Sequence, residues 1–282
     1  MRLLYLDTGL LSYFSKNAQT IDILKNEGFT LAFSRATIGD RLSATRSKRE
    51  LDFLKRTGAV YLCSDPAGAL TSLPENDPHQ IFNEFDPTEE KLLGLLFNRI
   101  VGGGDDTTNK DFLSTLSNVA SKITGTEFSL VFPDGDDSHT KPQKAFLKAF
   151  VKSPKLQGGQ SLTHFISNQT DDARTEFEKF LPQSPPLNTY DRVFAALMLN
   201  FIAQDPADGI RGKSSIASER EVLDAQHIAH GLGCDTFCTQ DKKTFNKYNL
   251  LAEYWDTKGK AELMEKTKTG KLEIKTPPCG GA

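Results

Sequence analysis

The chain has 282 residues, of which 38% are hydrophobic and 25% charged, and no apolar run approaches the roughly 18 residues that a membrane-spanning helix needs. Four cysteines are too few for a disulfide-based fold of this length, so we expect a protein of the reducing cytoplasm. The formal net charge of −3 excludes a global electrostatic attraction for nucleic acids.

The first part of the sequence alternates short apolar runs with segments of helical spacing. Strands are predicted over residues 3–6, 29–33 and 60–63. The helices predicted between them cover residues 8–14, 18–26 and 34–56. This alternation is typical of an α/β protein built around a parallel sheet.

From residue 64 the alternation stops, and loops rich in Pro and Gly separate the helices. These are predicted over residues 91–101, 141–151, 171–181 and 192–204. Ser218-Glu219-Arg220-Glu221 forms a capping box that begins a further helix, and residues 236–239 are a fourth strand. We therefore predict a discontinuous core, a mostly helical insertion and a basic C-terminal tail, over residues 1–63 with 190–255, 64–189 and 256–282 respectively.

Acidic residues follow two of the predicted strands. Asp7 follows the first strand and Asp241 the fourth, and ligands of open parallel sheets gather at such carboxyl ends. Asp40 and Asp224 lie in predicted helices, and Glu221 precedes Asp224 by three residues on the same helical face. Carboxylates brought together repel one another unless a cation or a shared proton intervenes. Oxygen ligands without His or Cys suit Mg²⁺ or Mn²⁺, although each acid alone is also explained as a helix N-cap or a solvated loop residue.

Four segments carry a resemblance to the PIN domain family of metal-dependent ribonucleases. They are Leu4-Tyr5-Leu6-Asp7-Thr8-Gly9-Leu10-Leu11, the stretch from Ser34 to Asp40, the helix from Asp224 to His230, and Thr239-Gln240-Asp241 with the following Phe245. The resemblance covers residues 1–63 and 190–250 and leaves the insertion unexplained.

The resemblance implies a three-layer α/β/α sandwich around a parallel sheet, with Asp7, Asp40, Asp224 and Asp241 at one edge. It implies that Asp7 and Asp241 ligate a Mg²⁺ or Mn²⁺ ion, that Asp224 shares a metal ion, and that Asp40 holds a metal-bound water or a second ion. Helical spacing adds Glu221 as a ligand. The activity implied is an endoribonuclease, in which the cation neutralises the transition state and activates water.

Two basic segments are candidates for the nucleic-acid face. Residues 41–56 hold six basic residues against two acids, and residues 242–275 hold nine lysines against five acids. Lys242 and Lys243 follow Asp241 and, with Thr239, are candidates for contacts with substrate phosphate. RNA is the expected substrate and single-stranded DNA the alternative. A toxin or defence effector, controlled by an antitoxin or another regulatory protein, and a homo-oligomer are further interpretations, whereas no membrane partner is expected.

Three alternatives remain open from the sequence. Gly9 and Asp40 stand where the PIN family usually has Asn and Glu, which favours a catalytically inactive PIN-like scaffold that binds RNA or protein. A phosphohydrolase like the haloacid dehalogenases also begins with a strand ending in Asp, but it needs a second Asp at the position of Gly9. His227 lies one turn after Asp224, so it either lines the site or is an ordinary structural histidine.

Overall fold

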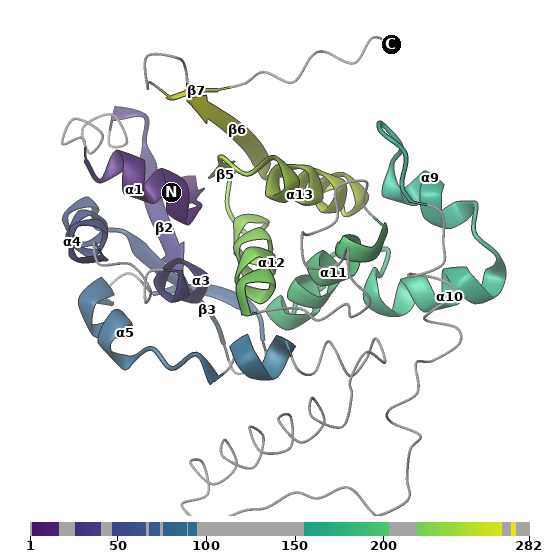
Figure 1. The fold of residues 1–282 in the computed structure, drawn as a ribbon, viewed down its shortest axis with the longest axis horizontal. Coiled ribbons are helices and arrows are strands. Elements are labelled where there is room, and N and C mark those ends of the chain that lie inside the picture. The colour runs from purple at the N-terminus through teal and green to yellow at the C-terminus, as the bar shows by residue number, and fades with distance from the viewer. Residues whose placement is uncertain are drawn as a thin grey trace, which may run out of the picture. The chain divides into compact units, whose positions relative to one another are not determined.

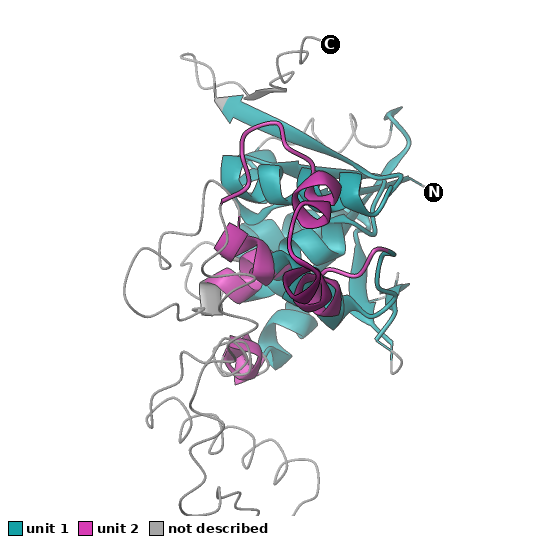
Figure 2. Cartoon of the chain, turned by 90° about the vertical axis from the view of Figure 1, so that its right-hand side faces the viewer, with its two compact units in different colours: residues 1–85, 184–196, 226–282 teal, residues 86–183, 197–225 magenta. Residues whose placement is uncertain are grey.

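The structure of the protein, a computed structural model, describes residues 2–16, 26–40, 47–65, 68–73, 76–88, 90–94, 155–202, 219–266 and 272–274. The chain divides into two compact units (Figure 2). Unit 1 comprises residues 1–85, 184–196 and 226–282, and unit 2 comprises residues 86–183 and 197–225. All the strands that the structure describes belong to unit 1.

The sheet of unit 1 is mostly parallel (Figure 1). Its strands are β1 (Arg2–Leu6), β2 (Phe29–Ser34), β3 (Val60–Ser64), β4 (Leu70–Leu73), β5 (Thr236–Thr239), β6 (Lys260–Lys266) and β7 (Leu272–Ile274), in the order β4-β3-β2-β1-β5-β6-β7. The neighbours from β3 to β6 pair in parallel, whereas β4 and β7 pair antiparallel at the two ends. From β1, the strands β2 and β3 are added on one side, and β5 and β6 are added on the other. The strand order therefore reverses between β1 and β5.

Several helices of unit 1 begin at a polar side chain that caps their first turn. Asp7 caps α1 (Thr8–Phe14), Asp77 caps α5 (Pro78–Glu84) and Asp241 caps α13 (Lys242–Tyr254). Ser34 and Thr37 form a capping box at α3 (Arg35–Gly39). The other described helices are α4 (Ser47–Thr57) in unit 1, and α9 (Leu162–Ser167) and α10 (Asp171–Phe180) in unit 2. Two more, α11 (Thr189–Ile202) and α12 (Glu219–Gly231), have residues in both units.

Alternate side chains of β1 are buried on opposite faces of the sheet. Leu4 and Leu6 belong to an apolar cluster on one face, whose other members are Leu10, Leu11, Leu31, Phe33, Ile38, Leu51, Phe53, Leu54, Ala59 and Cys238. Tyr5 faces the other side, where its ring stacks on His230 of α12 with the centroids 6.4 Å apart. Burial on both faces explains why the first strand is an unbroken apolar run.

Helix α12 approaches β5 closely because a glycine stands at the contact. A Cβ atom on Gly231 would lie only 2.9 Å from Cγ of the buried Phe237 ring. Such an approach is shorter than van der Waals contact, so a larger residue would force the helix and the strand apart.

The predicted α/β class with a largely parallel sheet is confirmed. The strands predicted over residues 3–6, 29–33, 60–63 and 236–239 match β1, β2, β3 and β5 within one residue at each end. The helices predicted over residues 18–26, 91–101 and 141–151 fall wholly or largely outside the described residues.

The single long helix predicted over residues 34–56 is wrong. Helix α3 ends at Gly39 with Asp40 as its C-cap, and α4 begins separately at Ser47. The sequence also predicted no strand within residues 256–282, whereas β6 lies beside β5 there. Charged residues alternate with Ala261, Leu263 and Met264 in this strand and obscure its apolar face. In the part of the chain that the structure describes, no helix has both the length and the apolar character of a membrane span.

Candidate functional site

The candidate site lies at the carboxyl ends of β1 and β5, where the strand order of the sheet changes direction. In open α/β sheets this is where ligands bind, because the connections from the two neighbouring strands diverge and leave a crevice. Asp7 directly follows β1, and Gln240 and Asp241 directly follow β5. The two acids predicted from strand ends therefore lie at the same edge of the sheet.

The Asp7 carboxylate is held by three neutral donors. Its Oδ1 accepts a hydrogen bond of 2.9 Å from the backbone N–H of Leu10, and its Oδ2 accepts one of 3.1 Å from the backbone N–H of Gln240. The hydroxyl of Thr239 also donates to Oδ2. No ion pair to Asp7 occurs among the described residues, and the side chain is half-buried. The described residues therefore fix this carboxylate without pairing it with a cationic group.

Thr239 links Asp7 to Asp241. The backbone N–H of Asp241 donates to the Thr239 hydroxyl at 2.9 Å, and this hydroxyl donates in turn to Asp7. The exposed Asp241 carboxylate caps α13 by accepting from the backbone N–H groups of Lys243 and Thr244 at 2.7 and 3.2 Å. Thr239 itself is completely buried, and its hydroxyl orients Asp7.

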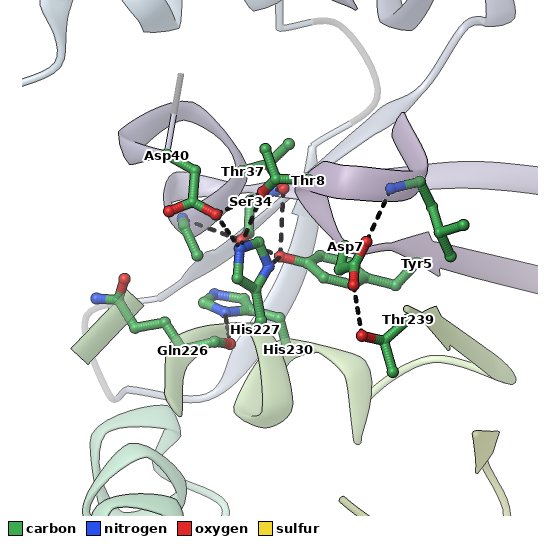
Figure 3. A network of polar contacts seen from close by, with 12 residues as sticks. Tyr5, Asp7, Thr8, Ser34, Thr37, Asp40, Gln226, His227, His230 and Thr239 are labelled. Atoms are coloured by element: carbon green, nitrogen blue, oxygen red, sulfur yellow. Dashed lines mark hydrogen bonds and ion pairs between the residues drawn. The ribbon is translucent and has the colours of Figure 1, made fainter. Parts of the chain in front are cut away.

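Asp40 lies at the same edge of the sheet, where it is hydrogen-bonded to Thr8, the residue that follows Asp7. Its Oδ2 accepts a hydrogen bond of 2.6 Å from the Thr8 hydroxyl and lies 3.0 Å from Nε2 of His227. The Asp40 side chain is 25% exposed, whereas that of His227 is 4% exposed. Figure 3 shows the imidazole of His227 between the Asp40 carboxylate and the hydroxyl of Tyr5.

The inner end of this network is fully buried. The Tyr5 hydroxyl lies 2.8 Å from Nδ1 of His227, 2.6 Å from the Ser34 hydroxyl and 3.3 Å from the Thr37 hydroxyl. Burial raises the pKa of Tyr5 far above its ordinary value, so the phenol stays protonated. Ser34 is also buried, and Tyr5 separates it from His227, so these groups do not form a serine-hydrolase triad.

The second histidine of α12 is held differently. The ring of His230 is buried, and its Nδ1 lies 2.6 Å from the backbone carbonyl oxygen of Gln226. Burial lowers the pKa of His230 to about 4, so its imidazole is neutral near pH 7. It therefore donates from Nδ1 to the helix backbone and has no bond to an acid of the edge.

The remaining predicted residues lie on two helices. Glu221 and Asp224 are both in α12, as the helical spacing required, but they belong to the part of that helix counted with unit 2. Glu221 is buried and Asp224 half-buried. Lys242 is exposed and Lys243 half-buried in the first turn of α13, next to Asp241. Asp7, Asp40 and Asp241 are thus the predicted acids that share unit 1.

Sequence reasoning missed the roles of Tyr5 and Thr8. Strand alternation could have placed Tyr5 on the face opposite Leu4 and Leu6, but its bond to His227 joins residues 222 positions apart. Thr8 follows Asp7 directly, and only the folded chain brings its hydroxyl to Asp40.

The comparisons with known proteins leave the site to be interpreted from its geometry. No family model, curated protein or solved structure matches this chain. Among the described residues, no three His, Cys, Asp or Glu side chains are already grouped as they would be around a metal ion.

Proposed function

We propose that unit 1 is a phosphodiesterase that depends on Mg²⁺ or Mn²⁺ and cleaves RNA. The observation that carries the proposal is the Asp7 carboxylate, which three neutral donors fix at the point where the strand order of the sheet reverses. A fixed, half-buried charge that no cationic side chain of the described residues pairs with favours a cation from solution. The strand order, and the helices in contact with both faces of the sheet, support the PIN-like α/β/α sandwich that the sequence resemblance implies.

The residues at the edge fit a hard divalent cation. Their donors are carboxylate and hydroxyl oxygens, and Mg²⁺ commonly uses one or two protein carboxylates and completes its shell with water and substrate phosphate. A grouping of three acidic side chains before binding is therefore not required. Asp7 and Asp241 would hold the ion, which would neutralise charge on the phosphodiester and lower the pKa of a bound water.

The other residues of the edge orient these acids and attract the substrate. Thr239 and Gln240 fix Asp7, and Asp40 is placed to accept a proton from water or to orient it. Lys242, exposed beside Asp241, would contact phosphate.

Helix α4 adds a basic surface for the RNA backbone. A hollow of about 560 Å³ is lined by Lys48, Arg49, Asp52, Lys55 and Arg56. Arg49 and Lys55 pair with Glu50 and Asp77. Lys48 and Arg56 are exposed, and Nε of Arg56 donates to the backbone carbonyl of Asp52. We expect RNA affinity to fall steeply as salt rises, because each phosphate contact releases a condensed counterion.

The test compares two aspartates at opposite ends of the same strands. Asp7 lies at the carboxyl ends of β1 and β5, whereas Asp235 lies at the opposite ends and accepts a 2.7 Å hydrogen bond from the backbone N–H of Leu3. The full chain should cleave labelled RNA in Mn²⁺, and Asp7→Asn should reduce the rate by about 100-fold or more. Asp235→Asn should cleave like the wild type. Cleavage that persists in EDTA and in Asp7→Asn would contradict the proposal.

Binding of the metal is measured separately by thermal unfolding. Mn²⁺ at about 100 times its dissociation constant should stabilise the wild type and Asp235→Asn by about 2.7 kcal/mol. Asp7→Asn should gain almost nothing, because it loses the anionic ligand.

A second candidate is a PIN-like scaffold that binds RNA without cutting it. The absence of a grouped triple of ligands among the described residues favours this function. Salt-sensitive RNA binding with neither cleavage nor stabilisation by Mn²⁺ would establish it over the enzyme.

A further inference from the structure

We propose that His227 is a positioning residue, which holds the Asp40 carboxylate at the edge by donating from Nε2–H. Its tautomer is set by Tyr5, whose hydroxyl is oriented in turn by the capping box of α3. The use of Asp40 in catalysis rests on the proposed function above. The tautomer of His227 and its bond to Asp40 do not.

The argument starts from the Ser34 hydroxyl, which is completely buried. This hydroxyl accepts a 3.2 Å hydrogen bond from the backbone N–H of Ala36, at the start of α3. Its own proton therefore needs a different acceptor, and the oxygen of Tyr5 lies 2.6 Å away. Ser34 thus donates to Tyr5, because a buried hydroxyl proton without an acceptor is costly.

The Thr37 hydroxyl reinforces this direction. It accepts a 3.2 Å hydrogen bond from the backbone N–H of Ser34 and lies 3.3 Å from the Tyr5 oxygen. Because its own buried proton also needs an acceptor, we infer that Thr37 donates to Tyr5. With Ser34 and Thr37 both donating to its oxygen, the Tyr5 hydroxyl uses its own proton toward Nδ1 of His227, 2.8 Å away. Nδ1 of His227 is therefore an acceptor.

A neutral imidazole that accepts at Nδ1 carries its proton on Nε2. Nε2 of His227 lies 3.0 Å from Oδ2 of Asp40 and 3.2 Å from the Thr8 hydroxyl oxygen. The Nε2–H group thus points at the acid and shares it with Thr8, which donates to the same oxygen at 2.6 Å. Two donors on one carboxylate oxygen fix the orientation of the Asp40 side chain.

His230 shows that burial on α12 does not by itself produce this arrangement. Both histidines are buried on the same helix, but His230 bonds to a backbone carbonyl of its own helix. His227 instead bonds to side chains of β1, α1 and the end of α3 through both ring nitrogens. Bonds of this kind orient site residues elsewhere, and their loss commonly costs about 10- to 100-fold in metal affinity or activity.

The first test is NMR of the full chain without metal. We expect the ¹⁵N shifts of His227 to show a protonated Nε2 and an unprotonated Nδ1, with a slowly exchanging Nε2–H proton. Tyr5→Phe removes the donor to Nδ1 and should shift that nitrogen or change the tautomer. A protonated Nδ1 with an unprotonated Nε2 in the wild type would overturn the proposal.

The second test uses two amides that each replace one ring nitrogen. His227→Gln places an amide N–H near the position of Nε2 and keeps the donor to Asp40, whereas His227→Asn reaches only the position of Nδ1 and loses that donor. The ¹³C shift of the Asp40 carboxyl should stay near its wild-type value in His227→Gln and change in His227→Asn. The same pair at His164, which is exposed on α9, serves as the control.

For cleavage, we expect His227→Asn to lower kcat by at least 10-fold with KM within threefold, and His227→Gln to stay within threefold of wild type. Equal losses in both variants, or an Asp40 shift that ignores both, would overturn the positioning role. If the wild type cleaves no RNA, the proposed function fails, while the NMR measurements still decide whether His227 holds Asp40.

Discussion

Two carboxylates of unit 1 are held in opposite ways. Glu50 of α4 is completely buried, and its Oε1 accepts hydrogen bonds from the Ser12 hydroxyl at 2.8 Å and from the Arg49 guanidinium at 3.0 Å. Asp7 is half-buried, and its donors among the described residues are two backbone N–H groups and a hydroxyl. Glu50 thus has a cationic partner where it ties α4 to α1, whereas no cationic side chain among the described residues pairs with Asp7 at the edge.

The difference separates an acid that serves the fold from one that is available to a ligand. Burial acts to raise the pKa of Glu50, but the bonds from Ser12 and Arg49 outweigh it, and the pKa falls below its ordinary value. Its charge is paired with Arg49 through Oε1, although its buried Oε2 has no hydrogen-bond partner among the described residues. Burial or a short hydrogen bond alone therefore does not identify a functional acid. What distinguishes the two acids is whether the groups that donate to them are charged or neutral.

The largest expected effect tests how completely the His230 ring is shielded from water. The folded protein holds the pKa of His230 near 4, against 6.5 in the unfolded chain, so the unfolded chain binds more protons between these values. The stabilisation is complete above pH 6.5 and is lost as the pH falls toward 4, by about 3 kcal/mol in total. Denaturant unfolding across this window measures it.

The control is His230→Asn, which can keep a donor to the Gln226 carbonyl but does not titrate. Its free energy of unfolding should depend less on pH than that of the wild type by about the same 3 kcal/mol. Identical pH profiles for the two proteins would mean that water reaches His230.

A smaller effect is expected at the buried acid. Glu50→Gln removes the ion pair with Arg49 and should lower the free energy of unfolding by about 2 kcal/mol at pH 7. Because the pKa of Glu50 is lowered on folding, the wild-type advantage is present above pH 4.5 and shrinks as the pH falls further. Urea titrations at pH 7 and pH 3.5 measure the change. Stabilisation by Mn²⁺ should be unaffected, and its loss in Glu50→Gln would erase the distinction from Asp7.

The smallest expected effect on the free energy of unfolding comes from a comparison of two buried threonines of β5. Thr239 donates to Asp7 and accepts from the backbone N–H of Asp241, whereas the buried Thr236 hydroxyl has no hydrogen-bond partner within the described part of the chain. Thr239→Val should destabilise by about 1 kcal/mol, and Thr236→Val should be neutral or stabilising by a similar amount. Thermal unfolding of the two variants checks the signs, and equal losses would show that the Thr239 bonds contribute nothing specific.

The sequence could predict the elements and the strand-end acids, but not how the acids are held. Apolar runs located β1 and β5, and the rule for parallel sheets then brought Asp7 and Asp241 to one edge. Helical spacing predicted one long helix that continued beyond Gly39, because the spacing of apolar residues does not reveal a C-cap such as Asp40. The bonds from His227 to Tyr5 and Asp40 connect distant segments, so no local pattern reveals them.

The close contact at Gly231 ties the evolution of helix α12 to that of the edge. Gly231 is the last residue of α12, and even the methyl group of an alanine there would meet the Phe237 ring. Gly231 follows His227 by one turn, so a displaced helix would carry the imidazole away from Asp40. A substitution of Gly231, which changes no polar atom, should therefore disrupt the bond between His227 and Asp40. We expect homologues in which this histidine bonds to the acid to retain the glycine.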